Sequence, residues 1–177
     1  MSTFDFSNTF VAVAPGTSDI YKVEIVTTEQ TQTQKGSDRL RFQARIVEGA
    51  RTGMEQENCT IRDGFNLPNS GDSNMDSMMA RMWMSFFISV GFDQEDIRTQ
   101  GFDFEKVNDG KAFENLIGRT GYVKFVPADP ENGSRYAKTN WLSAKQWAAA
   151  CSAQESVAAA SSSTDDDPLA KLLNGCL

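Results

Sequence analysis

Alternating apolar and polar side chains predict five short strands, because a strand that buries one face repeats every second residue. The predicted strands are residues 21–25, 39–47, 54–62, 121–126 and 135–142. In the second of them one face carries Leu40, Phe42, Ala44 and Ile46, and the other carries Arg39, Arg41, Gln43 and Arg45. The connections expected between them are a hairpin loop at 27–38, a turn at 48–53, and loops at 63–73 and 127–134.

Apolar side chains that recur three and four positions apart predict a helix between the third and fourth strands. Asn74 or Asp76 is expected to cap its start, and Gly91 its end. The repeat predicts that one face of this helix packs in the core through Met75, Met78, Met79, Met82, Trp83, Phe86, Phe87 and Val90. Short helices are also expected within residues 93–115 and 143–150.

The order of these elements predicts the fold. Three strands, a helix and two more strands are the layout of an OB-fold, a small, partly open Greek-key barrel. We therefore predict a mainly β, five-stranded OB-fold-like barrel in residues 1–150. A five-stranded sandwich is the alternative, because the sequence does not show strand register. Residues 151–177 are expected to be a flexible acidic tail, with disorder over the Ala-, Ser- and Asp-rich residues 153–168.

Charge is segregated along the chain, which changes the meaning of a net charge of −7. Residues 93–114 and 151–177 together account for the whole of that charge, so the remainder is neutral. A neutral body can bind an anion on a face where its arginines gather. Apolar residues make up 40% of the chain and charged residues 23%, which favours a packed core.

Several kinds of site are disfavoured by what the sequence lacks. It has no histidine, its three cysteines form no CxxC pair, and it has no phosphate-loop or HExxH motif. We therefore expect a protein that is not an enzyme and needs neither a metal nor a cofactor. The N-terminus does not resemble a secretory signal, and no apolar run approaches the roughly 20 residues that span a bilayer. A reducing, intracellular setting without a membrane is expected.

The arginine face of the second strand is the main candidate site. OB-folds bind ligands across strands two and three, between the loops that join strands one to two and four to five. In this layout that surface and its flanks hold Lys35, Arg39, Arg41, Arg45, Arg62, Phe65, Tyr122, Lys124, Arg135, Tyr136 and Lys138. Arginine binds phosphate oxygens in pairs, and aromatic rings stack on unpaired bases. The alternative is a solvated strand face whose arginines pair with Glu55 and Glu57. Trp141 is expected in the core.

The end of the chain is a second candidate site. An Ala/Ser-rich segment leads into an acidic triplet and then into apolar residues: Asp165, Asp166, Asp167, Leu169, Leu172 and Leu173. Acids can steer such a segment to a basic surface, and leucines can fill an apolar pocket. A tail that only aids solubility is the alternative, although it would not explain the leucines.

Turn residues and layout together resemble a known family. They include Phe4-Asp5-Phe6, the Lys35-Gly36 loop, the turn built on Ile46, Glu48, Gly49 and Gly53, and the approach Leu116, Gly118 and Gly121 to the fourth strand. The pattern resembles a phage early-protein family, formerly a domain of unknown function, of OB-fold single-stranded-DNA-binding proteins. The tail is similar to the acidic tips of bacterial single-stranded-DNA-binding proteins. It departs from them because Pro168 is followed by leucines.

The resemblance and the arginine face lead to one expectation of function. We expect a sequence-independent single-stranded-DNA-binding protein of phage DNA replication or recombination, located in the cytoplasm of the bacterial host. Its tail would recruit replication or recombination proteins. The alternatives are an OB-type protein-interaction adaptor, a minor virion component without DNA binding, or a binder of duplex DNA or RNA. Self-association into a homo-oligomer is left open by the sequence.

Overall fold

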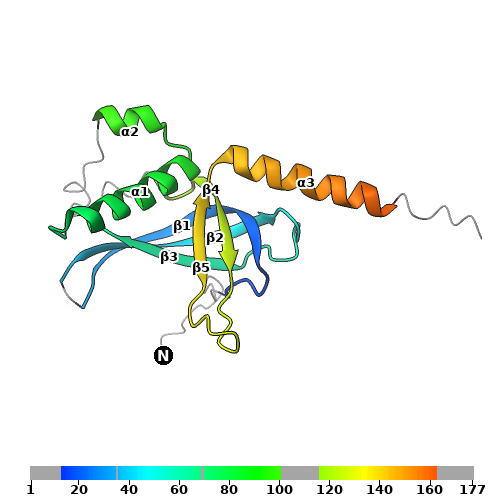
Figure 1. Cartoon of the computed structure of the whole chain (residues 1–177), viewed down its shortest axis with the longest axis horizontal. Helices are drawn as coiled ribbons and strands as arrows, with labels where there is room; N and C mark the ends of the chain where they lie inside the picture. The colour runs from blue at the N-terminus through cyan, green and yellow to red at the C-terminus, as the bar shows by residue number, and fades with distance from the viewer. Residues whose placement is uncertain (1–12, 35, 69, 101–115, 163–177) are drawn as a thin grey trace, which may run out of the picture.

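The computed structural model describes residues 13–34, 36–68, 70–100 and 116–162. Five antiparallel strands form one sheet in the order β3-β2-β1-β4-β5. They are β1 (Asp19–Gln32), β2 (Asp38–Gly49), β3 (Thr60–Asn66), β4 (Thr120–Val126) and β5 (Lys138–Leu142). The sheet curls into a half-barrel, and helix α1 (Ser73–Ser89) lies between β3 and β4 in the chain (Figure 1). The predicted OB-fold-like class is confirmed.

The curl of the sheet follows from the long strand β1, which pairs with two neighbours. Residues 19–24 of β1 pair with β4, whereas residues 21–32 pair with β2. The register with β2 shifts twice, between Lys22 and Val23 and between Ile25 and Thr27. Such irregularities bend a strand and increase its twist. As a result β4 and β5 cross the direction of the other three strands (Figure 1).

One carboxylate joins the two edge strands of the half-barrel. Asp63 of β3 lies opposite Phe42 in register, and its Oδ2 accepts hydrogen bonds from Thr139 Oγ1 at 2.6 Å and Trp141 Nε1 at 3.0 Å. Both donors belong to β5. The gap between β3 and β5 is therefore bridged by side chains at this point.

Helix α1 fills the barrel with aromatic rings. Phe86 stacks on Phe42 with ring centroids 4.6 Å apart and meets Trp141 edge-on at 4.9 Å. Trp83 packs against Phe65 and donates from Nε1 to the carbonyl of Asn66 at 3.0 Å. The predicted burial of Trp83, Phe86, Phe87, Val90 and Trp141 is confirmed. Such buried ring pairs stabilise the core beyond their area of contact.

The first half of α1 differs from the prediction. The cap is Asp72, whose side chain accepts from the backbone of Asn74 and Met75, so neither Asn74 nor Asp76 is the cap. The expected burial of the methionines was wrong: Met75, Met78 and Met82 are exposed, and Met79 is half-buried. The buried side chains of α1 begin only at Trp83, because the apolar repeat continues past the part of the helix that covers the barrel. Gly91 has the expected positive φ, of 87°.

Several strand limits also differ. The predicted third strand at 54–62 was wrong: residues 54–58 form turns, and the strand is β3. The predicted loop at 27–38 is shorter, because β1 continues as polar pairs with β2 as far as Gln32. The fifth strand starts three residues later than residue 135, at Lys138. The sequence did not show these limits because the residues at the ends of the strands are polar, and a strand whose side chains are polar on both faces has no alternation to detect.

Two further helices lie outside the barrel. Helix α2 (Gln94–Gln100) follows α1, and the rest of the acidic segment, residues 101–115, lies outside the described residues. Helix α3 (Ala144–Ser162) starts at a reciprocal cap between Ser143 and Gln146 and points away from the strands (Figure 1). It continues past residue 153, where disorder was expected to begin, because alanine favours helix strongly. No helix in the described ranges is long and apolar enough to cross a membrane.

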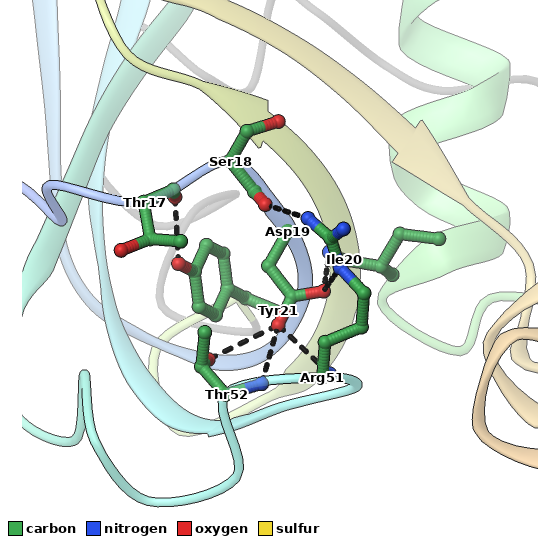
Figure 2. A network of polar contacts seen from close by, with 7 residues as sticks. All are labelled: Thr17, Ser18, Asp19, Ile20, Tyr21, Arg51 and Thr52. Atoms are coloured by element: carbon green, nitrogen blue, oxygen red, sulfur yellow. Dashed lines mark hydrogen bonds and ion pairs between the residues drawn. The ribbon is translucent and has the colours of Figure 1, made fainter. Parts of the chain in front are cut away.

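A polar clamp ties the start of β1 to the turn between β2 and β3 (Figure 2). Asp19, whose side chain is 2% exposed, accepts from the backbone N of Arg51 and of Thr52, each at 2.9 Å, and from Thr52 Oγ1 at 3.0 Å. Arg51 also donates to the carbonyl of Ser18. Burial alone would raise the pKa of Asp19, but the hydrogen bonds from Arg51, Thr52 and Ile20 favour the carboxylate, and the net pKa is lowered.

Replacing Asp63 with alanine should destabilise the barrel. Two hydrogen bonds to a charged acceptor would be lost, and bonds of that kind are worth about 1.5–3 kcal/mol each. We expect the free energy of unfolding, measured by urea denaturation, to fall by about 3–6 kcal/mol, the sum of the two bonds. Thr139→Val removes one donor and should cost less. A cost for Asp63→Ala no larger than that of Glu57→Ala, at an exposed turn position, would contradict the bridging role.

The lowered pKa of Asp19 makes its contribution to stability depend on pH. A carboxyl whose folded pKa lies below its unfolded value stabilises the fold above about pH 4, and this contribution is lost as pH falls through the folded pKa. Asp19→Asn should therefore be less stable than the native chain at pH 7, and the difference should shrink as the pH falls below about 4. Thermal unfolding across this range measures it, with Glu57→Gln as the control. A stability difference between Asp19→Asn and the native chain that does not change with pH would refute the stabilising role of the Asp19 carboxylate.

Candidate functional site

The arginines of β2 point to the outer face of the sheet, as the alternation predicted. Leu40, Phe42, Ala44 and Ile46 are buried, and the intervening side chains face away from the core. On this face Arg41 lies between Glu29 of β1 and Gly64 of β3, and Gln43 lies between Thr27 and Arg62. The register therefore brings Arg41 and Arg62 to the same part of the outer face.

An open hollow of about 560 Å³ lies over this part of the sheet. We call it the arginine hollow; it is lined by Thr27 and Glu29 of β1, Arg39, Arg41, Phe42 and Gln43 of β2, Arg62 and Asp63 of β3, and Ala137. Three of these residues are cations and two are acids, and Asp63 is engaged with β5. The hollow is therefore suited to an anionic ligand.

Two of the arginines are held by neighbours. Arg45 makes an ion pair with Glu24 on β1, with Nη2 and Oε2 2.6 Å apart. Arg39 donates from Nη2 to the carbonyl of Gly64 at 3.1 Å, while its buried Nε has no hydrogen-bond partner. The alternative, in which these arginines pair with Glu55 and Glu57, is wrong, because those acids lie in the turns before β3 and not opposite β2.

The other two arginines of this face are available to a ligand. Arg41 and Arg62 are both exposed, and the side chain of neither makes an ion pair or hydrogen bond with another residue of the described ranges. Each guanidinium carries five donors in a planar fork that matches a phosphate group. These two side chains are the strongest candidates for direct contact with an anion.

Gly64 shapes the floor of the arginine hollow. A Cβ at this position would lie 2.5 Å from the carbonyl oxygen of Leu40 and 3.1 Å from the Cα of Arg41. Both are backbone atoms of the paired strand, so they cannot move aside without distorting the ladder. Glycine thus allows β2 and β3 to approach closely where Arg39 reaches the Gly64 carbonyl.

The loop between β4 and β5 borders the hollow, as expected for this layout. Ala137 lines the hollow, and Tyr136 beside it is 80% exposed. Arg135 and Lys138 are also exposed. The loop is closed by paired backbone hydrogen bonds between Asp129 and Ser134, each 2.8 Å long. An exposed ring and two exposed cations therefore lie within two residues of Ala137, which lines the arginine hollow.

Three predicted site residues lie elsewhere. Phe65, expected in a loop, belongs to β3 and is 4% exposed in the core, so its ring is not accessible for stacking. Tyr122 and Lys124 lie on the outer face of β4, beside the start of β1. The ring of Tyr122 stacks on Trp147 of α3, with centroids 5.5 Å apart and planes at 23°.

Some residues were missed, and others are not described. Trp147 was not selected from the sequence, and its only signal was an aromatic side chain in an otherwise alanine-rich helix. Arg51, which lies within the turn predicted at residues 48–53, was likewise not predicted as a site residue. Lys35 lies outside the described residues, as do all predicted partner-binding residues of the tail: Asp165, Asp166, Asp167, Leu169, Leu172 and Leu173. Among the described residues, no group of three or more His, Cys, Asp or Glu side chains could hold a metal ion.

Comparisons with known proteins assign no family to this arrangement. No protein-family model matches the chain, and no curated protein matches it.

Replacing Gly64 with alanine should destabilise the sheet and distort the floor of the hollow. Overpacking of this kind typically costs about 1–3 kcal/mol. Urea denaturation should show that loss, whereas Gly16→Ala, whose added Cβ meets nothing within 4 Å, should leave stability within about 0.5 kcal/mol. Equal stabilities of the two variants would mean that β2 and β3 separate without cost.

Proposed function

We propose that the protein binds single-stranded DNA without sequence preference, and that it acts in phage DNA replication or recombination. The observation that carries the proposal is the arginine hollow, where Arg41 and Arg62 have no ion-pair partner among the described residues. A ligand that supplies phosphate groups would pair with these guanidinium groups.

Three properties favour a nucleic acid strand over a small anion. The hollow is open and is continuous with the outer face of the sheet, so it suits an extended ligand. Tyr136, whose ring is exposed, is the sequence neighbour of Ala137, which lines the hollow, and an unpaired base presents a flat surface that can stack on such a ring. Phosphate contacts and stacking read no base edges, so binding would depend weakly on sequence.

A protein-interaction adaptor is the second candidate function. It is favoured by the methionines of α1, since Met75, Met78 and Met82 are 46%, 50% and 41% exposed. Flexible methionine side chains are common on surfaces that bind other proteins.

In the DNA-binding proposal the C-terminal tail recruits replication or recombination proteins.

The double variant Arg41→Ala/Arg62→Ala should bind oligo-dT more weakly than the native chain. Each lost phosphate contact makes the negative slope of log K against log salt shallower by about 0.7 for single strands, so we expect the slope to become shallower by about 1.4. Fluorescence anisotropy with labelled oligo-dT at several salt concentrations measures both quantities. Arg98→Ala, on the exposed face of α2, is the control and should bind normally.

Two outcomes would decide against this proposal. If the native chain fails to bind oligo-dT at low salt, the DNA-binding function is wrong and the adaptor is favoured. If the double variant binds as tightly as Arg98→Ala, the arginine hollow is not the site of binding. Competition with duplex DNA and RNA distinguishes the preferred nucleic acid.

A further inference from the structure

A second hollow, of about 460 Å³, lies at the opposite end of β1 from the arginine hollow. We call it the lysine hollow. Its charged lining residues are Asp19, Arg51 and Lys124, and one side of α3 contributes Ala150, Ala153 and Gln154. The small alanine side chains leave space between the helix and the outer face of β4. The hollow thus lies between the Asp19 clamp and α3.

The charges of the lysine hollow favour an anion. The side chain of Asp19 is 2% exposed, and its oxygens accept from Arg51 and Thr52. The side chain of Arg51 is 58% exposed despite its contact with Asp19. Lys124 is exposed and makes no ion pair with a described residue. The two cations therefore reach solvent, whereas the one acid is already bonded within the protein.

A pair of stacked aromatic rings flanks this hollow. Tyr122 lies on the same face of β4 as Lys124, two residues earlier, and its ring stacks on that of Trp147. The half-buried side chains of α3 form a single stripe, Trp147, Ala150, Cys151 and Gln154, and no side chain described in this helix is fully buried. The helix is thus held to the sheet by a narrow contact in which Trp147 is the largest side chain.

Both hollows open along the outer face of the same strand. Ile20 of β1 lines the lysine hollow, and Thr27 lines the arginine hollow. Seven residues of strand separate these positions, which corresponds to roughly 20 Å at about 3.3 Å per residue. Lys22 and the pair of Arg45 with Glu24 lie between them on this face. A single extended ligand can therefore reach both hollows.

We propose that the lysine hollow is a second phosphate-binding subsite, which Lys124 and Arg51 provide for the same single strand that occupies the arginine hollow. The inference rests on the proposed function and extends it from one contact region to two. Strand binding at the second subsite places nucleotides next to Trp147, so the part of the emission change that Trp147→Phe removes reports on that subsite. Trp83 and Trp141 are buried in the core, and Trp141 donates to Asp63, which lines the arginine hollow, so the comparison with Trp147→Phe is needed to isolate the second subsite.

The test compares Lys124→Ala with Lys145→Ala, an exposed lysine of α3 that lines neither hollow. Oligo-dT of 20 nucleotides is titrated against each variant at several salt concentrations, with anisotropy and tryptophan emission as the readouts. We expect Lys124→Ala to bind several-fold more weakly, with a negative salt slope that is shallower by about 0.7, because one phosphate contact is lost. Lys145→Ala should match the native chain. DNA should quench tryptophan emission in the native chain, and Trp147→Phe should lose most of that change.

The possible results separate the two proposals. If Lys124→Ala and Lys145→Ala bind alike while Arg41→Ala/Arg62→Ala binds weakly, the second subsite is refuted and the proposed function stands. If oligo-dT quenches Trp147→Phe as strongly as the native chain, the strand does not pass α3, which also refutes the subsite. If the native chain binds no oligo-dT, both proposals fail.

Discussion

The hydrogen bonds accepted by Asp63 determine how the two ends of the sheet meet. The curled sheet ends at β3 on one side and at β5 on the other, and one carboxylate joins them through Thr139 and Trp141. The same contact fixes β5 beside β3. As a result, the loop between β4 and β5 borders the arginine hollow through Ala137. The hydrophobic core and the candidate binding face therefore depend on one polar contact that is partly buried.

The arginines of an acidic protein remain available because the acids are distributed unevenly. The segments that carry the net negative charge lie outside β1 to β3, and within these strands Glu24 engages only Arg45. Glu29 faces Arg41 in register without forming an ion pair with it. Local charge, set by strand register, thus differs from the average charge of the chain, and only the local charge meets a ligand.

The sequence predicted those features that repeat with a regular period. The alternation in β2 and the aromatic half of α1 gave the fold class, the inward residues and the outward arginines. Where a strand continues as polar pairs, as β1 does up to Gln32, its residues show no such period, and the end of the strand could not be predicted. The methionines of α1 followed the helical repeat but extend beyond the barrel, because a repeat does not show where the neighbouring strands end. Phe65 and Trp147 could be placed only from tertiary contacts.

The bridge between β3 and β5 also bears on how this chain avoids misassembly. Each of these strands is an edge of the sheet, and unpaired backbone groups at an edge can template pairing with another chain. A charged side chain turned inward at such an edge opposes that pairing, since an incoming strand would have to bury it without its partners. Asp63 is therefore placed to oppose edge-to-edge pairing as well as to close the half-barrel, and the guanidinium of Arg39 contacts the Gly64 carbonyl at the same edge.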